Sequence, residues 1–382
     1  MKRTFLAGIG DANDPRTWSG TPFHLLEAGC KCGIFDEGLN LSVTSWAWRV
    51  TRVLWNIATL MRGRRYGGFQ YSDWFLERLY APVQSRLQGN RIINWCQLFP
   101  ASIVSNEAIE KWFYIDMTLR QLFRCYELGA SMDKRARESA IEREKDGYRA
   151  AKGIMTLSQW AAESVVRDYG IPPARVHAIV PGANIAAGHY SKWFSVASYR
   201  QADPERPLRL VFTGKYWKRK GLDRLLEAFL LARARGANLS LRVIGVDRET
   251  IPTKYCDATA VEWIGFLDKR TESTAFLNAV SDCDIGCLLS RAEAAGIAVR
   301  EYCALGLVTL CTDAGGMPEM PIPEASLSVP VDASNEETAE VLLRLCRDRQ
   351  ATEQMRQRAW SLRCEALWDS AVAQMRTQLQ TS

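Results

Sequence analysis

The chain has 382 residues and a mass of 43.1 kDa, which is too long for one ordinary core and is typical of two domains. Apolar residues make up 47% and charged residues 24%, a balance that excludes a disordered, collagen-like or low-complexity protein. The longest uncharged stretch, residues 176–191, is too short for a transmembrane helix and contains Pro181, so we expect a cytoplasmic protein.

The 11 cysteines are scattered along the chain and form no CxxC pair. Cys30 and Cys32 are one residue apart, so a metal site there is one alternative. Only three histidines are present to complete such a site, and reduced structural thiols are the better interpretation. We therefore expect no metal.

The first half opens with a short apolar run, Thr4–Ile9, followed by a turn-rich stretch, Gly10–Gly20. A helix is expected to begin near Pro22, because proline suits the first helical turn. Ser158 precedes a helical pattern and is expected to cap it. Buried strands are expected at Arg91–Cys96, Trp112–Ile115, Gly153–Leu157 and Val176–Val180, and helices at Ala130–Ala151 and Gln159–Tyr169.

The positive charge of the chain is concentrated in residues 46–91. This segment holds eight arginines against Asp73 and Glu77, an excess equal to the net charge of +6 of the whole chain. An apolar stripe recurs there at helical spacing, with Arg49 and Arg52 away from it. Two interpretations stay open: a helix in an anionic membrane interface, or a core-facing helix whose arginines are solvated or bind an anionic acceptor. The stripe consists of Val50, Val53, Leu54, Ile57, Leu60 and Met61, and the arginines are Arg49, Arg52, Arg62, Arg64, Arg65, Arg78, Arg86 and Arg91.

Residues 186–207 lack a clear apolar period, and we place the domain boundary there, between a first domain at 1–190 and a second at 205–355. Beyond it strands and helices alternate, which predicts a parallel sheet covered on both faces. The expected strands are Leu208–Phe212, Leu239–Ile244, Val261–Gly265, Ile285–Leu288 and Val308–Cys311, and the expected helices are Leu222–Arg235, Thr271–Ala279 and Ala298–Leu305. Ligands of such sheets bind at the carboxyl ends of the strands.

Two loops at those ends carry chemistry. Residues 213–221 place four cations within six residues, and Gly214 allows a ligand to approach while Lys215 and Lys220 reach a diphosphate. The alternative to an anion-binding loop is a basic turn whose side chains are only solvated. In residues 290–301, helix-start N–H groups near 296–298 suit a phosphate. Glu293, before this helix, suits sugar hydroxyls, and Glu301, within it, suits a ribose diol.

These motifs resemble a known family. The Glu-x7-Glu spacing of Glu293 and Glu301, the segment 304–306 (ALG) and residues 313–319 (DAGGMPE) look like the signature of the family 4 retaining glycosyltransferases, which have the GT-B fold. Lys215 and Lys220 match the family's diphosphate-binding pair, although Arg is commoner at the first position. In the first half, 155–160, 169–170 and 180–184 resemble the end of the family's first domain, and 19–21 its N-terminal glycine loop.

The resemblance implies two Rossmann-like domains that face a central cleft, with the acceptor on the first and a UDP- or GDP-sugar on the second. Glu293 with the backbone of Ala295, Gly296, Ile297 and Ala298 would hold the sugar, and Glu301 the ribose. Lys215, Lys220 and Gly214 would bind the diphosphate, Gly20 would approach it, and Leu267 would lie near the base. No metal or other cofactor is implied, because the lysines would stabilise the leaving group. The C-terminal helix, about 360–382, would cross back onto the first domain.

Two departures from the family pattern stand out. The family usually has Glu-Gly-Phe-Gly where this chain has Glu293-Ala294-Ala295-Gly296, a change that reshapes the sugar pocket. Many relatives carry a histidine in the first domain, but no histidine stands between residues 25 and 176. Asp116, at an apparent strand end, is the substitute candidate, and it either accepts a hydrogen bond from a sugar hydroxyl or caps the next helix.

The leading hypothesis is a retaining hexosyltransferase that serves cell-surface polysaccharide or glycoconjugate synthesis, with Glu293, Asp116 and Lys215 as candidate catalytic residues. Its partners would be a nucleotide-sugar donor and a glycan or lipid-linked acceptor, with no nucleic acid. Peripheral contact of residues 46–91 with the inner face of the membrane is one alternative for the location. A nucleotide-sugar epimerase of similar fold and a non-catalytic nucleotide-sugar-binding protein are the competing functions.

Overall fold

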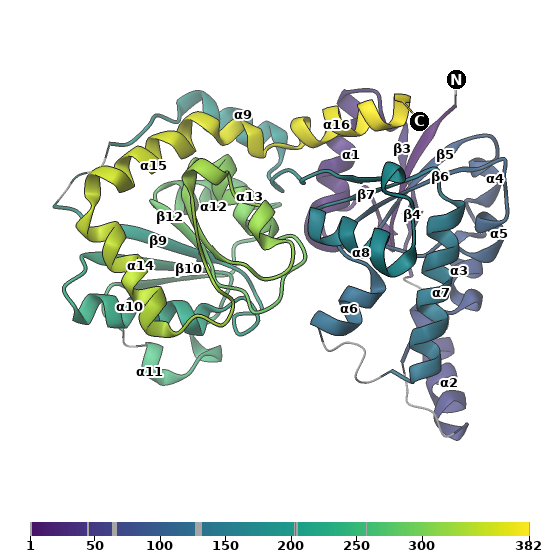
Figure 1. Cartoon of the computed structure of the whole chain (residues 1–382), viewed down its shortest axis with the longest axis horizontal. Coiled ribbons are helices and arrows are strands. Elements are labelled where there is room, and N and C mark those ends of the chain that lie inside the picture. The colour runs from purple at the N-terminus through teal and green to yellow at the C-terminus, as the bar shows by residue number, and fades with distance from the viewer. Residues whose placement is uncertain are drawn as a thin grey trace. The chain divides into compact units, whose positions relative to one another are not determined.

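The computed structural model describes residues 2–43, 46–62, 67–126, 132–201, 203, 205–256 and 258–381. By their internal contacts the residues form two units, unit 1 (Met1–Val180 with Ala371–Ser382) and unit 2 (Pro181–Ser370). Each unit is an α/β domain built on a six-stranded parallel sheet (Figure 1). Two such domains confirm the predicted GT-B fold class.

The sheet of unit 1 has the strand order β3-β1-β5-β6-β7-β8, and all of its neighbouring strands are parallel. Its central strands are almost fully buried, as expected where helices cover both faces. The strands are β1 (Thr4–Ala7), β3 (Glu37–Gly38), β5 (Arg91–Trp95), β6 (Glu110–Ile115), β7 (Gly153–Thr156) and β8 (Val176–Ala178), and β2 (Gly10–Asp11) pairs antiparallel with β4 (Asn40–Leu41).

Helix caps and side-chain hydrogen bonds position the helices of unit 1. Ser158 caps α8 by accepting a hydrogen bond from the Ala161 N–H, which confirms the predicted cap. The C-terminal helix α16 packs in this unit, where Arg376 donates to the Cys32 carbonyl and Arg91 donates to the Leu379 carbonyl. The α-helices are α1 (Thr21–Lys31), α2 (Trp46–Met61), α3 (Asp73–Tyr80), α4 (Gln84–Leu87), α5 (Ala101–Val104), α6 (Leu119–Cys125), α7 (Lys134–Ala150), α8 (Gln159–Tyr169) and α16 (Trp368–Thr381), and the 3-10 turns are Thr17–Gly20, Phe69–Tyr71 and Pro173–Arg175.

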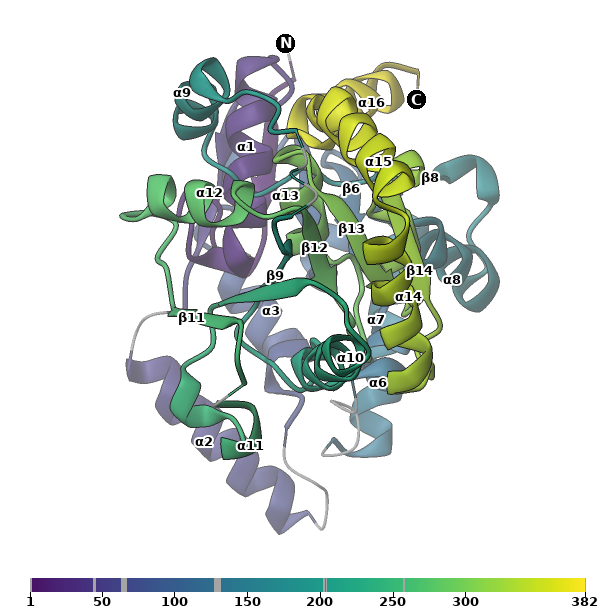
Figure 2. The same ribbon diagram turned by 90° about the vertical axis from the view of Figure 1, so that its left-hand side faces the viewer.

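The sheet of unit 2 has the order β11-β10-β9-β12-β13-β14, again parallel throughout. Helices α10 and α14 pack side by side against it (Figure 2). The strands are β9 (Leu208–Thr213), β10 (Leu239–Ile244), β11 (Val261–Gly265), β12 (Ile285–Leu288), β13 (Val308–Thr312) and β14 (Ser326–Val329). The helices are α9 (Ala187–Val196), α10 (Leu222–Ala234), α11 (Thr253–Cys256), α12 (Ser273–Ser281), α13 (Ile297–Ala304), α14 (Asn335–Arg347) and α15 (Arg349–Leu362), with 3-10 turns at Arg248–Thr250, Met317–Glu319, Pro323–Ala325 and Arg363–Ala366.

Helix α9 lies in the stretch where the sequence shows no apolar period and where no helix was predicted. Its aromatic side chains supply the contacts that a regular stripe would otherwise give. The Tyr190 hydroxyl donates to the Ala304 carbonyl at 2.9 Å, and the Trp193 ring lies edge-on to Trp360 with centroids 6.1 Å apart. Tertiary contacts therefore stabilise this helix although its sequence has only a weak helical periodicity.

Within the part of the chain that the structure describes, every helix is too short or too polar to cross a bilayer.

Candidate functional site

The strand order of unit 2 places two loops beside each other. The chain begins at β9, continues outward to β10 and β11, and then returns to β12 on the other side of β9. In an open parallel sheet such a reversal leaves a crevice at the carboxyl ends of the two neighbouring strands. The loops that follow β9 and β12 are 214–221 and 289–296, which are the two segments that carry the predicted site.

The basic loop begins with a glycine against which Lys220 packs. A Cβ atom on Gly214 would lie 2.3 Å from Cδ of Lys220, so a larger residue here would displace the lysine side chain. The ammonium group of Lys215 lies 4.0 Å from the ring centroid of Phe266. The aromatic face holds this cation near the end of β11. The two predicted lysines thus have different neighbours, Phe266 for Lys215 and Glu293 for Lys220.

The second loop leads into α13, which begins at Ile297 with Gly296 at its N-cap. A Cβ atom on Gly296 would lie 2.5 Å from the Met317 sulfur, so packing against the following loop requires glycine there. Ala294 and Ala295 are buried, and the site of Ala295 is where the usual family pattern has the larger side chain of phenylalanine. The first N–H groups of a helix lack intrahelical partners, so this end of α13 favours an anion.

Glu293 lies between two cations. Its Oε2 accepts a hydrogen bond from Arg219 Nη1 at 3.0 Å and lies 3.6 Å from Lys220 Nζ, and the Ser290 hydroxyl is 3.4 Å away. The carboxylate is only 13% exposed. Two positive groups around one negative group leave a local excess of positive charge, which attracts an anionic ligand. The sequence singled out Lys220 and Glu293 separately, but it did not indicate that they form an ion pair.

Glu301 lies within α13 and is almost completely buried, with 4% of its side chain exposed. Its Oε1 accepts a hydrogen bond from Lys269, whose ammonium group also lies 4.4 Å from the Phe276 ring centroid. Lys269 was not predicted as a site residue. It stands two positions beyond Leu267, the expected neighbour of the base, so its place directly after that loop was the available signal.

The two loops are bound to each other. The Arg291 N–H donates to the Arg219 carbonyl at 2.8 Å, and Arg219 Nη1 donates to the Ala292 carbonyl at 2.8 Å. Arg291 also forms a bidentate ion pair with Asp223 in the first turn of α10, with both distances 2.8 Å. Such contacts hold the loops in a fixed relation before any ligand arrives.

The remaining predicted residues belong to unit 1. Gly20 has a φ of 86° and is the N-cap of α1, a left-handed conformation that glycine adopts without strain. Asp116 follows β6, and its Oδ1 lies 3.2 Å from the Cys96 sulfur. Burial raises the pKa of the Cys96 thiol well above its usual range, so the sulfur is the protonated donor. Thr118 is the N-cap of α6, so the alternative that Asp116 caps this helix is wrong.

The predicted second-domain residues all belong to unit 2 and lie on the loops that follow β9, β11 and β12 or on α13. They are Gly214, Lys215, Lys220, Leu267, Glu293, Ala295, Gly296, Ile297, Ala298 and Glu301. Within the described ranges, no group of three or more His, Cys, Asp and Glu side chains is arranged to hold a metal ion.

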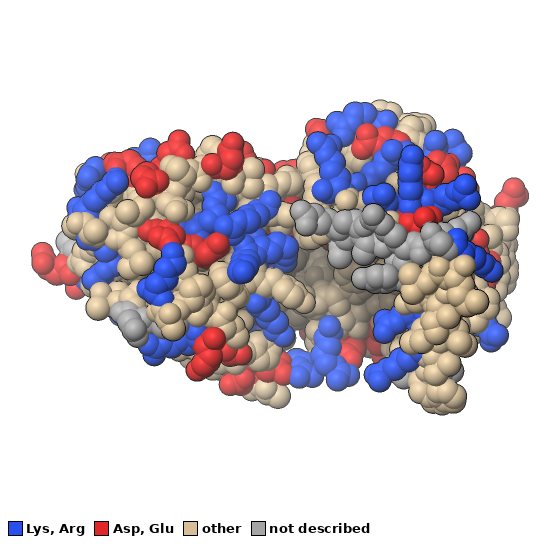
Figure 3. All heavy atoms as spheres, turned by 90° about the horizontal axis from the view of Figure 1, so that it is seen from below, with Lys and Arg blue, Asp and Glu red and all other residues tan. Residues whose placement is uncertain are grey.

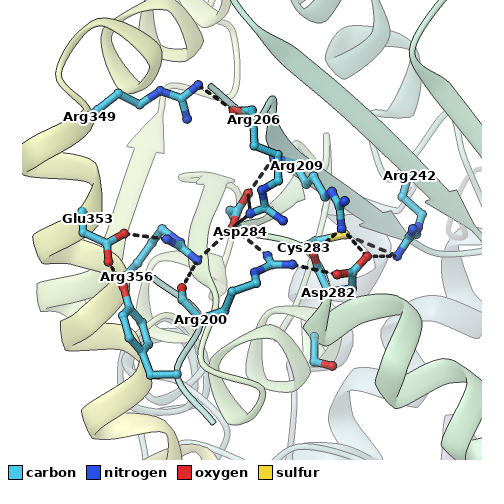
Figure 4. A network of polar contacts seen from close by, with 12 residues as sticks. Arg200, Arg206, Arg209, Arg242, Asp282, Cys283, Asp284, Arg349, Glu353 and Arg356 are labelled. Carbon is cyan, nitrogen blue, oxygen red and sulfur yellow. Dashed lines mark hydrogen bonds and ion pairs between the residues drawn. The ribbon is translucent and has the colours of Figure 1, made fainter. Parts of the chain in front are cut away.

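A second charged cluster lies at the opposite, amino edge of the same sheet (Figure 4). Asp284 precedes β12, and its side chain is only 1% exposed. It accepts hydrogen bonds or ion pairs from the Arg209 N–H at 2.8 Å and from the guanidinium groups of three arginines at 2.9–3.1 Å. These are Arg200, Arg206 and Arg356. Asp282 nearby is far more exposed and pairs with Arg200 at 2.7 Å.

The fold of the chain is that of the GT-B glycosyltransferases. The most similar structures include a sucrose-phosphate synthase from Thermosynechococcus elongatus, with a TM-score of 0.66 and 16% identity over 99% of both chains. Anabaena HepE in complex with UDP has a TM-score of 0.63 and 15% identity over the full length of both chains. WaaG, a glycosyltransferase involved in lipopolysaccharide biosynthesis, has a TM-score of 0.57 and 16% identity over 95% of this chain and 94% of its own.

Residues 198–361 match the family model of the glycosyl transferases group 1. This stretch contains both loops of the crevice and the whole sheet of unit 2. A comparison with curated protein sequences gave no match.

Proposed function

We propose that this protein is a retaining glycosyltransferase that moves a hexose from a nucleotide diphosphate sugar to a glycan or lipid-linked acceptor. The observation that carries the proposal is the convergence of Lys220, Glu293 and the N-terminus of α13 at one crevice of unit 2. The family match over residues 198–361 and the complex of Anabaena HepE with UDP support it.

The chemistry of the crevice fits a departing diphosphate. In the proposed reaction the bond between the anomeric carbon and the diphosphate oxygen breaks, and the acceptor oxygen bonds to the same face of that carbon. Lys215, Lys220 and the N-terminus of α13 stabilise the negative charge that develops on the leaving group. The acceptor proton passes to a phosphate oxygen of the donor, so the reaction requires neither a metal ion nor another cofactor.

The other predicted groups would position the donor. Glu293 and the backbone of residues 295–297 would hold the sugar, and Glu301 would accept hydrogen bonds from the ribose. Because Glu301 is paired with Lys269, the ribose hydroxyls would meet a carboxylate whose orientation is already fixed. In unit 1, Gly20 would approach the diphosphate and Asp116 a sugar hydroxyl. We further propose that the acceptor belongs to cell-surface polysaccharide or glycoconjugate synthesis.

The first test is thermal stabilisation by UDP-, GDP-, ADP- and TDP-sugars. A ligand at about 100 times its dissociation constant stabilises a folded protein by about 2.7 kcal/mol, which gives a readily measured shift. We expect one nucleotide to stabilise the wild type and to stabilise Lys215→Ala clearly less. Lys218→Ala, which removes an exposed cation from the same loop, is the matched control and should respond like the wild type.

Turnover is the second measurement. With the donor so identified, we expect transfer or slow hydrolysis of the sugar, and NMR of the first product should show the anomeric configuration of the donor. Binding without transfer or hydrolysis would indicate a nucleotide-sugar-binding protein instead. No stabilisation by any of the sugars would contradict the proposed donor site.

A further inference from the structure

Helix α2 presents an apolar face to solvent instead of to the core. Seven large apolar side chains along it are between 43% and 84% exposed, so the core-facing interpretation of the predicted stripe is wrong. Figure 3 shows the helix as an uncharged projection at the lower right, with basic side chains at its border. The exposed residues are Trp46, Val50, Val53, Leu54, Ile57, Leu60 and Met61.

The opposite face of α2 anchors the helix to unit 1. The Trp48 ring lies edge-on to Phe75, with centroids 5.2 Å apart, and Trp55 lies edge-on to Phe69 at 5.9 Å. At about 100° per residue, Trp48 and Trp55 lie roughly opposite Val50 and Ile57 on the helix. An aromatic contact therefore fixes which face the helix exposes, and the exposed apolar face covers an arc of about 120°.

The charges around this face have one sign. Residues 46–62 contain Arg49, Arg52 and Arg62 and no acidic residue, and all three arginines are exposed. Beside the helix, Trp74 is a further exposed aromatic ring, and the Arg78 guanidinium lies 5.3 Å from its centroid. The neighbouring Asp73 is paired with Arg143. The predicted basic segment also holds Arg64 and Arg65, which lie outside the described residues.

We propose that α2 docks on the surface of an anionic lipid membrane, with its apolar face among the upper acyl chains and its arginines at the lipid phosphates. An amphipathic helix with tryptophan on the apolar side and arginine at its border suits that interface. A second copy of the chain fits less well, because a symmetric contact would bring two sets of three arginines together without a countercharge. The docking does not depend on the proposed glycosyl transfer.

The test is flotation of the full-length protein with vesicles of phosphatidylcholine alone or mixed equally with phosphatidylglycerol. We expect binding to the anionic vesicles, weaker binding at high salt, and little binding to phosphatidylcholine alone. In the double variant Leu54→Glu/Ile57→Glu the partition coefficient should fall at least roughly tenfold, because two carboxylates would enter the apolar layer. Ser85→Glu/Gln88→Glu adds the same charge at exposed positions of unit 1 outside α2 and should bind like the wild type.

Three results would overturn the proposal. Equal loss of binding in both double variants would show a general charge effect, and unchanged binding in Leu54→Glu/Ile57→Glu would exclude α2. A lipid-free dimer that Leu54→Glu/Ile57→Glu dissociates, detected by sedimentation velocity, would identify a second copy as the occupant. Circular dichroism and thermal unfolding should match the wild type in both variants, since the substituted side chains are exposed.

Discussion

At the amino edge of the unit 2 sheet, Asp284 is enclosed by three guanidinium groups, whereas at the carboxyl edge Glu293 lies between Arg219 and Lys220. Both are carboxylates among cations, yet their surroundings differ. Asp284 has a backbone N–H as a further donor and almost no exposure. The cations of Glu293 are partly exposed and belong to the loop that begins with Gly214. A buried carboxylate whose hydrogen-bonding positions are all occupied, which we call a saturated cluster, stabilises the packing of the strands. A cluster in which partly exposed cations outnumber the carboxylate can bind an anionic ligand.

The largest expected effect is on stability at the amino edge. Asp284→Ala would leave the buried Arg356 and its neighbours without their shared carboxylate, and breaking such a buried pair costs about 3–5 kcal/mol. We expect the free energy of unfolding of unit 2 to fall by that amount in chemical denaturation. Asp282→Ala, at a far more exposed carboxylate, should cost less than about 1 kcal/mol. Similar costs for both variants would contradict the saturated-cluster interpretation.

A third carboxylate, that of Glu144 in unit 1, is buried and accepts its hydrogen bonds from hydroxyl groups and a backbone N–H instead of from cations. Glu144 accepts hydrogen bonds from the Tyr148 hydroxyl at 2.9 Å, from the Tyr169 hydroxyl and from the Leu119 N–H at 2.9 Å. Burial raises its pKa to about 7, although these hydrogen bonds oppose the shift. The folded state therefore holds a proton that the unfolded chain releases near pH 4.5.

The sign of the pH dependence follows from this shift. The stabilisation from protonated Glu144 is fully present below pH 4.5 and is lost as the pH rises through about 7. We expect unit 1 to be less stable at pH 8 than at pH 5, by on the order of 3 kcal/mol from this group. Glu144→Gln should remove that part of the difference in denaturation experiments. An unchanged difference in the variant would assign the pH dependence to other groups.

At the carboxyl edge the expected effect is on turnover. Glu293→Gln keeps the shape of the side chain but removes the charge that we propose to hold the sugar, and we expect turnover to fall roughly a hundredfold. Stability should change by less than about 0.5 kcal/mol, because Arg219 and Lys220 are partly exposed and become hydrated. Affinity for the free nucleotide should increase, since Lys220 is no longer shared with a carboxylate. Unchanged turnover would remove Glu293 from the reaction.

The smallest effect is expected for a single cation of the crevice. Lys220→Met should weaken binding of the nucleotide diphosphate about tenfold, which is about 1.4 kcal/mol, and reduce its salt dependence. Titration calorimetry at two salt concentrations measures both quantities. Lys218→Met is the matched control from the same loop. Equal losses in the two variants would mean that the loop acts only through its total charge.

Much of unit 2 could be predicted from the sequence, because buried parallel strands occur in a sequence as short apolar runs between turns. The predicted bounds of Leu239–Ile244, Val261–Gly265 and Ile285–Leu288 are those of β10, β11 and β12. The loops that follow β9 and β12, with their glycines and charges, were the ones that the sequence indicated as the candidate site. The pairing of Lys269 with Glu301 could not be predicted, because it joins residues 32 positions apart through the fold.

The orientation of α2 could not be predicted from the sequence either. Periodicity identifies an apolar stripe but not the surface that the stripe faces, and here the tryptophans of the opposite face make the tertiary contacts. Aromatic contacts of the same kind hold α9, where the periodic signal is weak. Both cases show that a few large rings can decide the placement of a helix against its pattern.

The chain passes between the two units twice, at Val180 and again at Ser370, because α16 returns to unit 1. This connectivity has a consequence for biosynthesis. During translation all residues of unit 2 are synthesised before unit 1 is complete, since α16 follows unit 2 in the chain. The nascent first half therefore keeps the surface that α16 covers exposed until unit 2 and then α16 have been synthesised.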